Sequence, residues 1–162
     1  MNEKDDFSTD NQLNLRLRGG YEKLAEKILK NSCPFCNLKE KYILAEKDGL
    51  VLTVNIFPYI DGQLMVIPRR HIKSFEEVTV EETVTNYFLS QLAITLLREE
   101  LGVKGVWMLL RDGGLGSESG KTVEHLHWNI LPYTDSLNTW HHQELSVTPA
   151  EMAVRLRSKI DK

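Results

Sequence analysis

The segment Gly113–Pro132 has the sequence GGLGSESGKTVEHLHWNILP, and it indicates both a strand of the fold and a functional site. Residues 123–131 suit a β-strand, in which successive side chains point to opposite faces of the sheet. One face therefore carries three polar residues: His125, His127 and Asn129. The apolar residues between them share the other face. We expect the apolar row to be buried and the polar row to line a site.

Glycines, hydroxyl residues and one cation come directly before this predicted strand. Glycine allows positive φ and close backbone approach to a ligand, and successive N–H groups in such loops form anion-binding concavities. The sequence therefore predicts a phosphate-binding loop that leads into a row of imidazoles. Its predicted ligand contacts are Gly120, Lys121 and Thr122.

Each of these features has a simpler interpretation when it is taken alone. A single histidine on a strand is usually structural, and an H-x-H pair is equally consistent with a metal site. A glycine-rich loop followed by a strand lacks the helix N-terminus of a Walker loop. A glycine-rich loop that leads directly into a strand with an H-x-H pair is a combination that favours a functional site.

Composition indicates a globular protein that has no general affinity for nucleic acid. The chain has 162 residues, of which 41% are hydrophobic and 27% charged, and its net charge is −3. An anionic ligand must therefore be bound by a local pocket. No apolar run approaches the ~20 residues of a membrane span, and the N-terminal residues lack the apolar core of a signal peptide. We expect a cytoplasmic protein without membrane attachment.

The pattern of elements predicts an α+β fold. Residues 1–20 are predicted to be a flexible N-terminal arm, and residues 21–162 a single domain. Five strands are expected to form an antiparallel sheet, at 41–46, 50–56, 63–68, 104–110 and 123–131. Short helices are expected at 21–30 and 149–160.

One long helix is predicted between the third and fourth strands. Thr79 and Glu82 form a capping box at its start, and Gly102 ends it. The apolar periodicity predicts that one stripe of this helix packs on the core: Val80, Val84, Tyr87, Phe88, Leu92, Thr95 and Leu96.

The motif Cys33-Pro34-Phe35-Cys36 has three interpretations. A disulfide is disfavoured in a cytoplasmic protein. A redox Cys-x-x-Cys motif lacks its usual βαβ context here. Half of a zinc site requires two more ligands, for which histidines are available. The residues alone leave these alternatives open.

Residues 120–131, GKTVEHLHWNIL, resemble the signature of the histidine triad (HIT) family, in which three histidines alternate with apolar residues. Asn129 stands in place of the third histidine, while Lys121 and Thr122 replace the usual Gln and Ser. The resemblance extends over about residues 33–133, where Gly62-Gln63 replaces the usual Gly-His. The segments NIFPY and EHLHW are most similar to the diadenosine-tetraphosphate-cleaving branch of the family. The resemblance implies the HIT-like fold.

The resemblance also implies a nucleotide hydrolase or nucleotidyl transferase that acts on a dinucleoside polyphosphate or an adenosine phosphoramidate. His127 would attack the α-phosphorus to form a nucleotidyl-histidine, the His125 carbonyl would hold the other ring nitrogen protonated, and Asn129 would donate an amide hydrogen bond. No catalytic metal would be needed. The residues that correspond to the ribose contact and the pocket walls are Asn55, Ile56 and Phe57.

The family further implies a structural zinc ion bound by Cys33, Cys36, His71 and His125, and a homodimer with the long helix at the contact. Two other functions stay open. One is a nucleotide-binding regulatory or adaptor protein that has little turnover because Asn129 replaces the third histidine. The other is a zinc-dependent structural module that binds no nucleotide.

Overall fold

The structure is a computed structural model, and it describes residues 33–133, 147, 148 and 156. The predicted arm and the predicted N-terminal helix lie outside the described residues. The predicted C-terminal helix also lies outside them, apart from Leu156.

Five strands form one antiparallel sheet in the order β1-β2-β3-β5-β4, which confirms the predicted α+β fold. Their bounds are β1 (Ile43–Lys47), β2 (Leu50–Val54), β3 (Leu64–Pro68), β4 (Val106–Leu110) and β5 (Trp128–Pro132). Asp48 and Gly49 both have positive φ, which suits the tight β1–β2 turn. Within residues 33–133, three single-turn 3₁₀ helices accompany the sheet: η2 (Glu40–Tyr42), η3 (Phe75–Glu77) and η4 (Gly116–Glu118).

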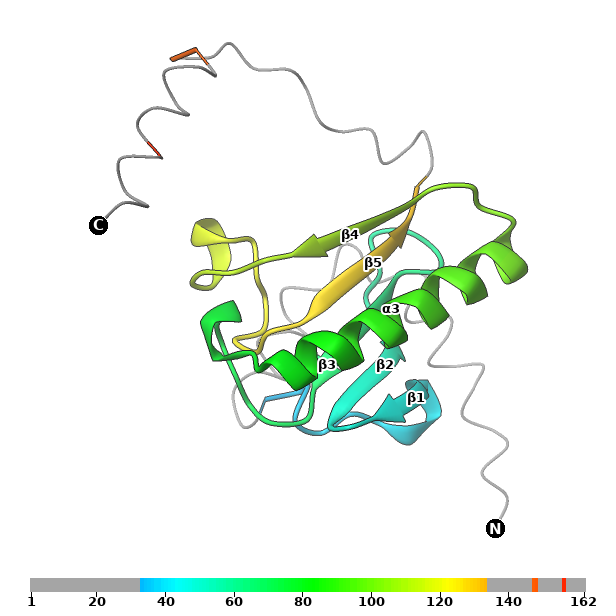
Figure 1. The fold of residues 1–162 in the computed structure, drawn as a ribbon, viewed down its shortest axis with the longest axis horizontal. Helices are drawn as coiled ribbons and strands as arrows, with labels where there is room; N and C mark the ends of the chain where they lie inside the picture. The colour runs from blue at the N-terminus through cyan, green and yellow to red at the C-terminus, as the bar shows by residue number, and fades with distance from the viewer. Residues whose placement is uncertain (1–32, 134–146, 149–155, 157–162) are drawn as a thin grey trace.

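The long helix α3 (Val80–Leu101) lies across one face of the sheet (Figure 1). Both hydrogen bonds of the predicted capping box between Thr79 and Glu82 are present. Gly102 adopts the left-handed conformation at φ 64°, and its N–H donates to the Arg98 carbonyl. Both predicted ends of the helix are therefore confirmed.

The predicted inward stripe of α3 is wrong, because most of its residues face solvent. Val80 is 75% exposed and Tyr87 is 58% exposed. The residues that the helix buries are Glu82, Thr85, Leu89, Ser90, Ala93 and Leu97. This side carries several small side chains, which allow the helix backbone to lie close to the sheet. The helix is apolar on two sides, so periodicity alone could not identify the side that packs.

The hydrophobic core lies between α3 and the sheet. It consists of Leu50, Leu52, Leu64, Val66, Ile72, Leu89, Ala93, Leu97, Leu126, Trp128 and Ile130. Because Leu126, Trp128 and Ile130 all belong to it, the predicted apolar row is confirmed as a core face. The residues that alternate with them therefore point away from α3.

The predicted strand 123–131 begins only at Trp128. β3 pairs with β5 from Leu64 to Val66 and then loses its partner. Pro68 has no N–H to continue the ladder, and its carbonyl accepts a hydrogen bond from the His125 ring at 2.9 Å. The Leu126 N–H donates to the Ile72 carbonyl instead. His125 and His127 consequently lie on the irregular segment that leads into β5.

Among the residues that the structure describes, none of the helices combines the length and the apolar character that crossing a membrane requires.

Candidate active site

His127 has the geometry of a nucleophile. Its side chain is 6% exposed, and its Nδ1 lies 2.9 Å from the His125 carbonyl oxygen. A carbonyl only accepts hydrogen bonds, so Nδ1 carries the proton and Nε2 keeps its lone pair. The pKa of His127 is lowered to about 4, chiefly by burial and also by the charges of Arg111 and Lys121, while the hydrogen bond to the His125 carbonyl opposes the shift. At neutral pH the ring is therefore the neutral imidazole, with its proton on Nδ1 and a lone pair on Nε2.

His125 has the opposite tautomer. Its Nε2 donates to the Pro68 carbonyl at 2.9 Å, so its Nδ1 is the nitrogen with a lone pair. That Nδ1 lies 3.3 Å from Cys33 Sγ and 3.6 Å from Cys36 Sγ. Burial lowers the pKa of His125, and the charge of His71 lowers it further. A neutral imidazole with this orientation is suited to metal ligation.

The structure brings together the four residues that the resemblance indicated as metal ligands. The ligand atoms of Cys33, Cys36, His71 and His125 all lie within 4.8 Å of one another, and Cys36 Sγ is 3.2 Å from His71 Nδ1. Tetrahedral bonds of ~2.3 Å to sulfur and ~2.0 Å to nitrogen place neighbouring S and N ligands about 3.5 Å apart. The sulfur–nitrogen separations of 3.2, 3.3 and 3.6 Å match that geometry. These residues could therefore hold a metal ion.

The cysteine turn also contacts the candidate nucleophile. Phe35, between the two cysteines, packs edge-on against His127 with ring centroids 5.0 Å apart and against His125 at 5.9 Å. The Cys36 N–H donates to the Cys33 carbonyl and closes the turn. The turn that carries Cys33 and Cys36 therefore also packs against the His127 ring.

Asn129 is held on both sides by hydrogen bonds. Its Oδ1 accepts from Gln63 Nε2 at 2.9 Å, and its Nδ2 donates to the Leu109 carbonyl at 3.4 Å. Gln63 Oε1 in turn accepts from the Tyr59 N–H at 2.8 Å. The sequence showed that Gln63 and Asn129 each replace a usual histidine, but it did not show that they touch.

The segment after β2 joins this network. Asn55 Oδ1 accepts from the Phe57 N–H at 2.9 Å, and the Asn55 N–H donates to the Gln63 carbonyl at 3.0 Å. Asn55, Ile56 and Phe57 are half-buried. The predicted nucleoside-contact residues are therefore connected through Gln63 to Asn129.

The glycine-rich loop is shaped by its own backbone. Gly116 and Gly120 have positive φ, and their N–H groups donate to the carbonyls of Lys121 and Gly116. Lys121 is 1% exposed, and its Nζ donates to the Lys73 carbonyl at 2.9 Å. The Lys121 ammonium is therefore directed into the protein, although its charge contributes to lowering the pKa of His127. Thr122 is exposed.

Arg111 is a site residue that the sequence reasoning missed. Its Nη1 donates to the Tyr59 hydroxyl at 3.0 Å and to the Gly120 carbonyl at 3.1 Å. The guanidinium also lies over the Tyr59 ring, 5.1 Å from its centroid. It thereby bridges the segment after β2 and the glycine-rich loop. The only sequence signal was its position directly after the β4 strand.

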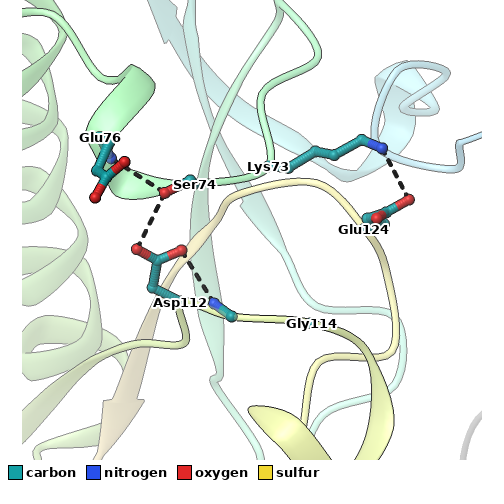
Figure 2. A pocket seen from close by; sticks show the side chains of 7 residues that line it. Lys73, Ser74, Glu76, Asp112, Gly114 and Glu124 are labelled. Atoms are coloured by element: carbon teal, nitrogen blue, oxygen red, sulfur yellow. Dashed lines mark hydrogen bonds and ion pairs between the residues drawn. The ribbon is translucent and has the colours of Figure 1, made fainter.

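A polar hollow of about 520 Å³ lies beside the glycine-rich loop (Figure 2). Its lining residues are Lys73, Ser74, Glu76, Asp112, Gly113, Gly114 and Glu124. Figure 2 shows Lys73 paired with Glu124, and the Asp112 carboxylate beside the Ser74 hydroxyl. The Asp112 carboxylate also accepts from the Gly113 N–H. The predicted site residues, all of which the structure describes, lie outside this lining.

Comparison with known proteins identifies the family. The family model described as HIT domain matches residues 38–136, which is more than half of the chain. An uncharacterized HIT-like protein of Mycoplasma genitalium is 28% identical over 117 residues, covering 66% of this chain and 77% of that protein. An AP-4-A phosphorylase of Mycobacterium tuberculosis is 29% identical, covering 61% of this chain and 52% of the phosphorylase.

Solved structures share the fold. A HIT family protein of Bacillus subtilis matches with a TM-score of 0.66 at 19% identity, covering 82% of this chain and 97% of that one. A Zn-bound histidine triad family protein of Mycobacterium smegmatis matches with a TM-score of 0.56 at 20% identity, covering 80% and 96%.

Proposed function

Because the chain belongs to the HIT domain family, we propose that it transfers a nucleotidyl group from a dinucleoside polyphosphate, or from an adenosine phosphoramidate, to an acceptor. The observation that carries the proposal is the state of His127. Its Nδ1 proton is fixed by the His125 carbonyl, and its Nε2 is unprotonated. The named activity of the AP-4-A phosphorylase relative supports this substrate class.

In the first step, the Nε2 lone pair of His127 forms a bond to the α-phosphorus. The bond from phosphorus to the leaving group breaks, and the leaving group departs with the electron pair. The nucleotidyl imidazole then carries a positive charge, which the Nδ1–H bond to the His125 carbonyl stabilises. In the second step water, phosphate or another acceptor attacks the phosphorus, and any proton that the attacking oxygen carries passes to solvent. The bond between phosphorus and Nε2 breaks, and its electron pair returns to His127.

Several groups would stabilise the charge that develops on the phosphoryl oxygens. Asn129 supplies an amide and Thr122 a hydroxyl, whereas the Gly120 N–H already donates to the Gly116 carbonyl. Arg111 and Lys121 supply positive potential, which is visible in the lowered pKa of His127. Asn55, Ile56 and Phe57 would bind the nucleoside.

We propose that Cys33, Cys36, His71 and His125 hold a zinc ion. Two thiolates and two imidazoles complete a four-coordinate set, which is typical of structural zinc. A bound zinc ion would fix the cysteine turn, and with it Phe35, against the His125–His127 segment. The nucleotidyl transfer needs only the side chains described above.

We also propose a homodimer. The exposed apolar residues of α3 include Val80, Val84, Tyr87, Phe88 and Leu92. Such a patch is characteristic of protein interfaces. β4 is an edge strand of the sheet, and its Met108 is 51% exposed. Pairing of two copies would cover both features.

A rapid-quench experiment tests the enzyme assignment. The wild type should release a burst of the leaving group from diadenosine tetraphosphate, because nucleotidyl transfer to His127 precedes discharge. His127→Ala should remove the burst and keep AMP affinity within about tenfold, since binding depends on the other site residues. A wild type that binds AMP but releases no product would instead support a regulatory or adaptor protein, which the replacement of the third histidine by Asn129 favours.

A further inference from the structure

Gln63 and Asn129 form a buried pair of neutral amides. Each residue is 2% exposed, and the Gln63 Nε2 donates to Asn129 Oδ1 at 2.9 Å. The pair belongs to a chain of hydrogen bonds that runs from the Tyr59 N–H through both amides to the Leu109 carbonyl. It thereby connects the segment after β2 with β5 and β4.

The two ends of this chain fix the direction of both amides. The Tyr59 N–H can only donate, so it requires the Gln63 oxygen on its side and turns the Gln63 NH₂ toward Asn129. The Leu109 carbonyl can only accept, so it requires the Asn129 NH₂. The Asn129 oxygen is therefore occupied by Gln63, and its NH₂ retains a second N–H.

We propose that Gln63 is a positioning residue that makes Asn129 a hydrogen-bond donor toward the phosphoryl group of the bound nucleotide; this inference rests on the function proposed above. Asn129 follows His127 by two residues on the face that points away from α3. A reversed Asn129 amide would present its oxygen to phosphoryl oxygens, and two acceptors repel. Gln63 disfavours that orientation, because its NH₂ group requires an acceptor opposite it and the Asn129 oxygen provides one.

The test compares affinities for AMP and adenosine, measured by calorimetry, because their ratio isolates the phosphoryl contact and needs no turnover. Gln63→Met has similar volume and removes the donor. Gln63→Leu also removes the donor, and it adds no charge that could act on the AMP phosphate. Asn129→Ala removes the proposed contact itself. Gln91→Met, on an exposed part of α3, is the matched control for the chemical change.

Each Gln63 variant should weaken AMP binding about tenfold, in line with the loss of a hydrogen bond to a charged group, and change adenosine binding by less than about twofold. Gln63→Met should cause no further loss of AMP affinity in the Asn129→Ala background, because residues that act through one contact are not additive. Gln91→Met should bind both ligands as the wild type does. If the methionine variant does not unfold cooperatively on heating, the affinities of Gln63→Leu decide the test.

Equal weakening of AMP and adenosine would overturn the inference, since it indicates a purely structural role. Additive losses in the double variant would overturn it as well, because Gln63 would then act independently of Asn129. A wild type that binds neither ligand would refute the proposed function, and the inference with it. If the wild type binds AMP, then equal weakening of both ligands or additive losses in the double variant would refute the inference and leave the proposed function standing.

Discussion

Arg111 provides a test of which part of the substrate the site recognises. Its Nη1 is used by Tyr59 and Gly120, while Nη2 and Nε have no hydrogen-bond partner among the residues that the structure describes. A hydrogen bond to a charged group contributes about 1.5–3 kcal/mol. At ~1.4 kcal/mol per decade, Arg111→Met should lower kcat/KM for a dinucleoside polyphosphate by about ten- to a hundredfold.

The same substitution should affect an adenosine phosphoramidate much less, by under about threefold, because its leaving group carries no phosphate for the guanidinium to bind. Steady-state kinetics on both substrates measures the difference, and Arg111→Lys is the matched control, which keeps the charge and loses the fork. Equal losses for the two substrates would refute a contact between Arg111 and the leaving-group phosphates, and would indicate that its charge acts on the transferred phosphoryl group alone.

Three further perturbations test the metal site, the interface and the fold. Cys36→Ser should lose the bound zinc, measured by atomic absorption, and lower the melting temperature, because metal binding is coupled to folding; unchanged melting would count against a structural metal. Phe88→Glu should give a monomer in sedimentation with an unchanged circular dichroism spectrum, and a persistent dimer would exclude this face of α3. Glu82→Gln should lower the free energy of unfolding by about 1–2 kcal/mol at neutral pH, since Glu82 caps α3 and pairs with Arg70. Because Arg70 and the Thr79 N–H lower the pKa of Glu82, this contribution is present above the ordinary carboxyl pKa and disappears as the pH falls through the lowered value, so denaturation of the two proteins should converge in acid.

The sequence predicted the ends of α3 and the core face of the central strand, because both depend on residues that are close together in the chain. The capping box of Thr79 and Glu82 and the terminal Gly102 predicted both ends of α3, because each depends on residues within one turn. The alternation of Leu126, Trp128 and Ile130 predicted the core face of the central strand.

The features that the sequence did not predict depend on contacts between distant segments. The start of β5 is set by Pro68, whose lack of an N–H ends the pairing with β3. The packed side of α3 is set by its fit to the sheet, which periodicity on a helix with two apolar sides cannot decide. The contact between Gln63 and Asn129 joins residues 66 positions apart, and each alone was only a departure from the family pattern.

The covalent intermediate is directly observable in the intact mass of the protein, quenched within milliseconds of mixing with diadenosine tetraphosphate. We expect one nucleotidyl adduct on a single histidine, His127, with the acid lability of a phosphorus–nitrogen bond. We also expect that His127→Asn, which keeps a side-chain donor for the His125 carbonyl, forms none. Turnover without an adduct, or an adduct that persists in His127→Asn, would contradict the assignment of His127 as the nucleophile.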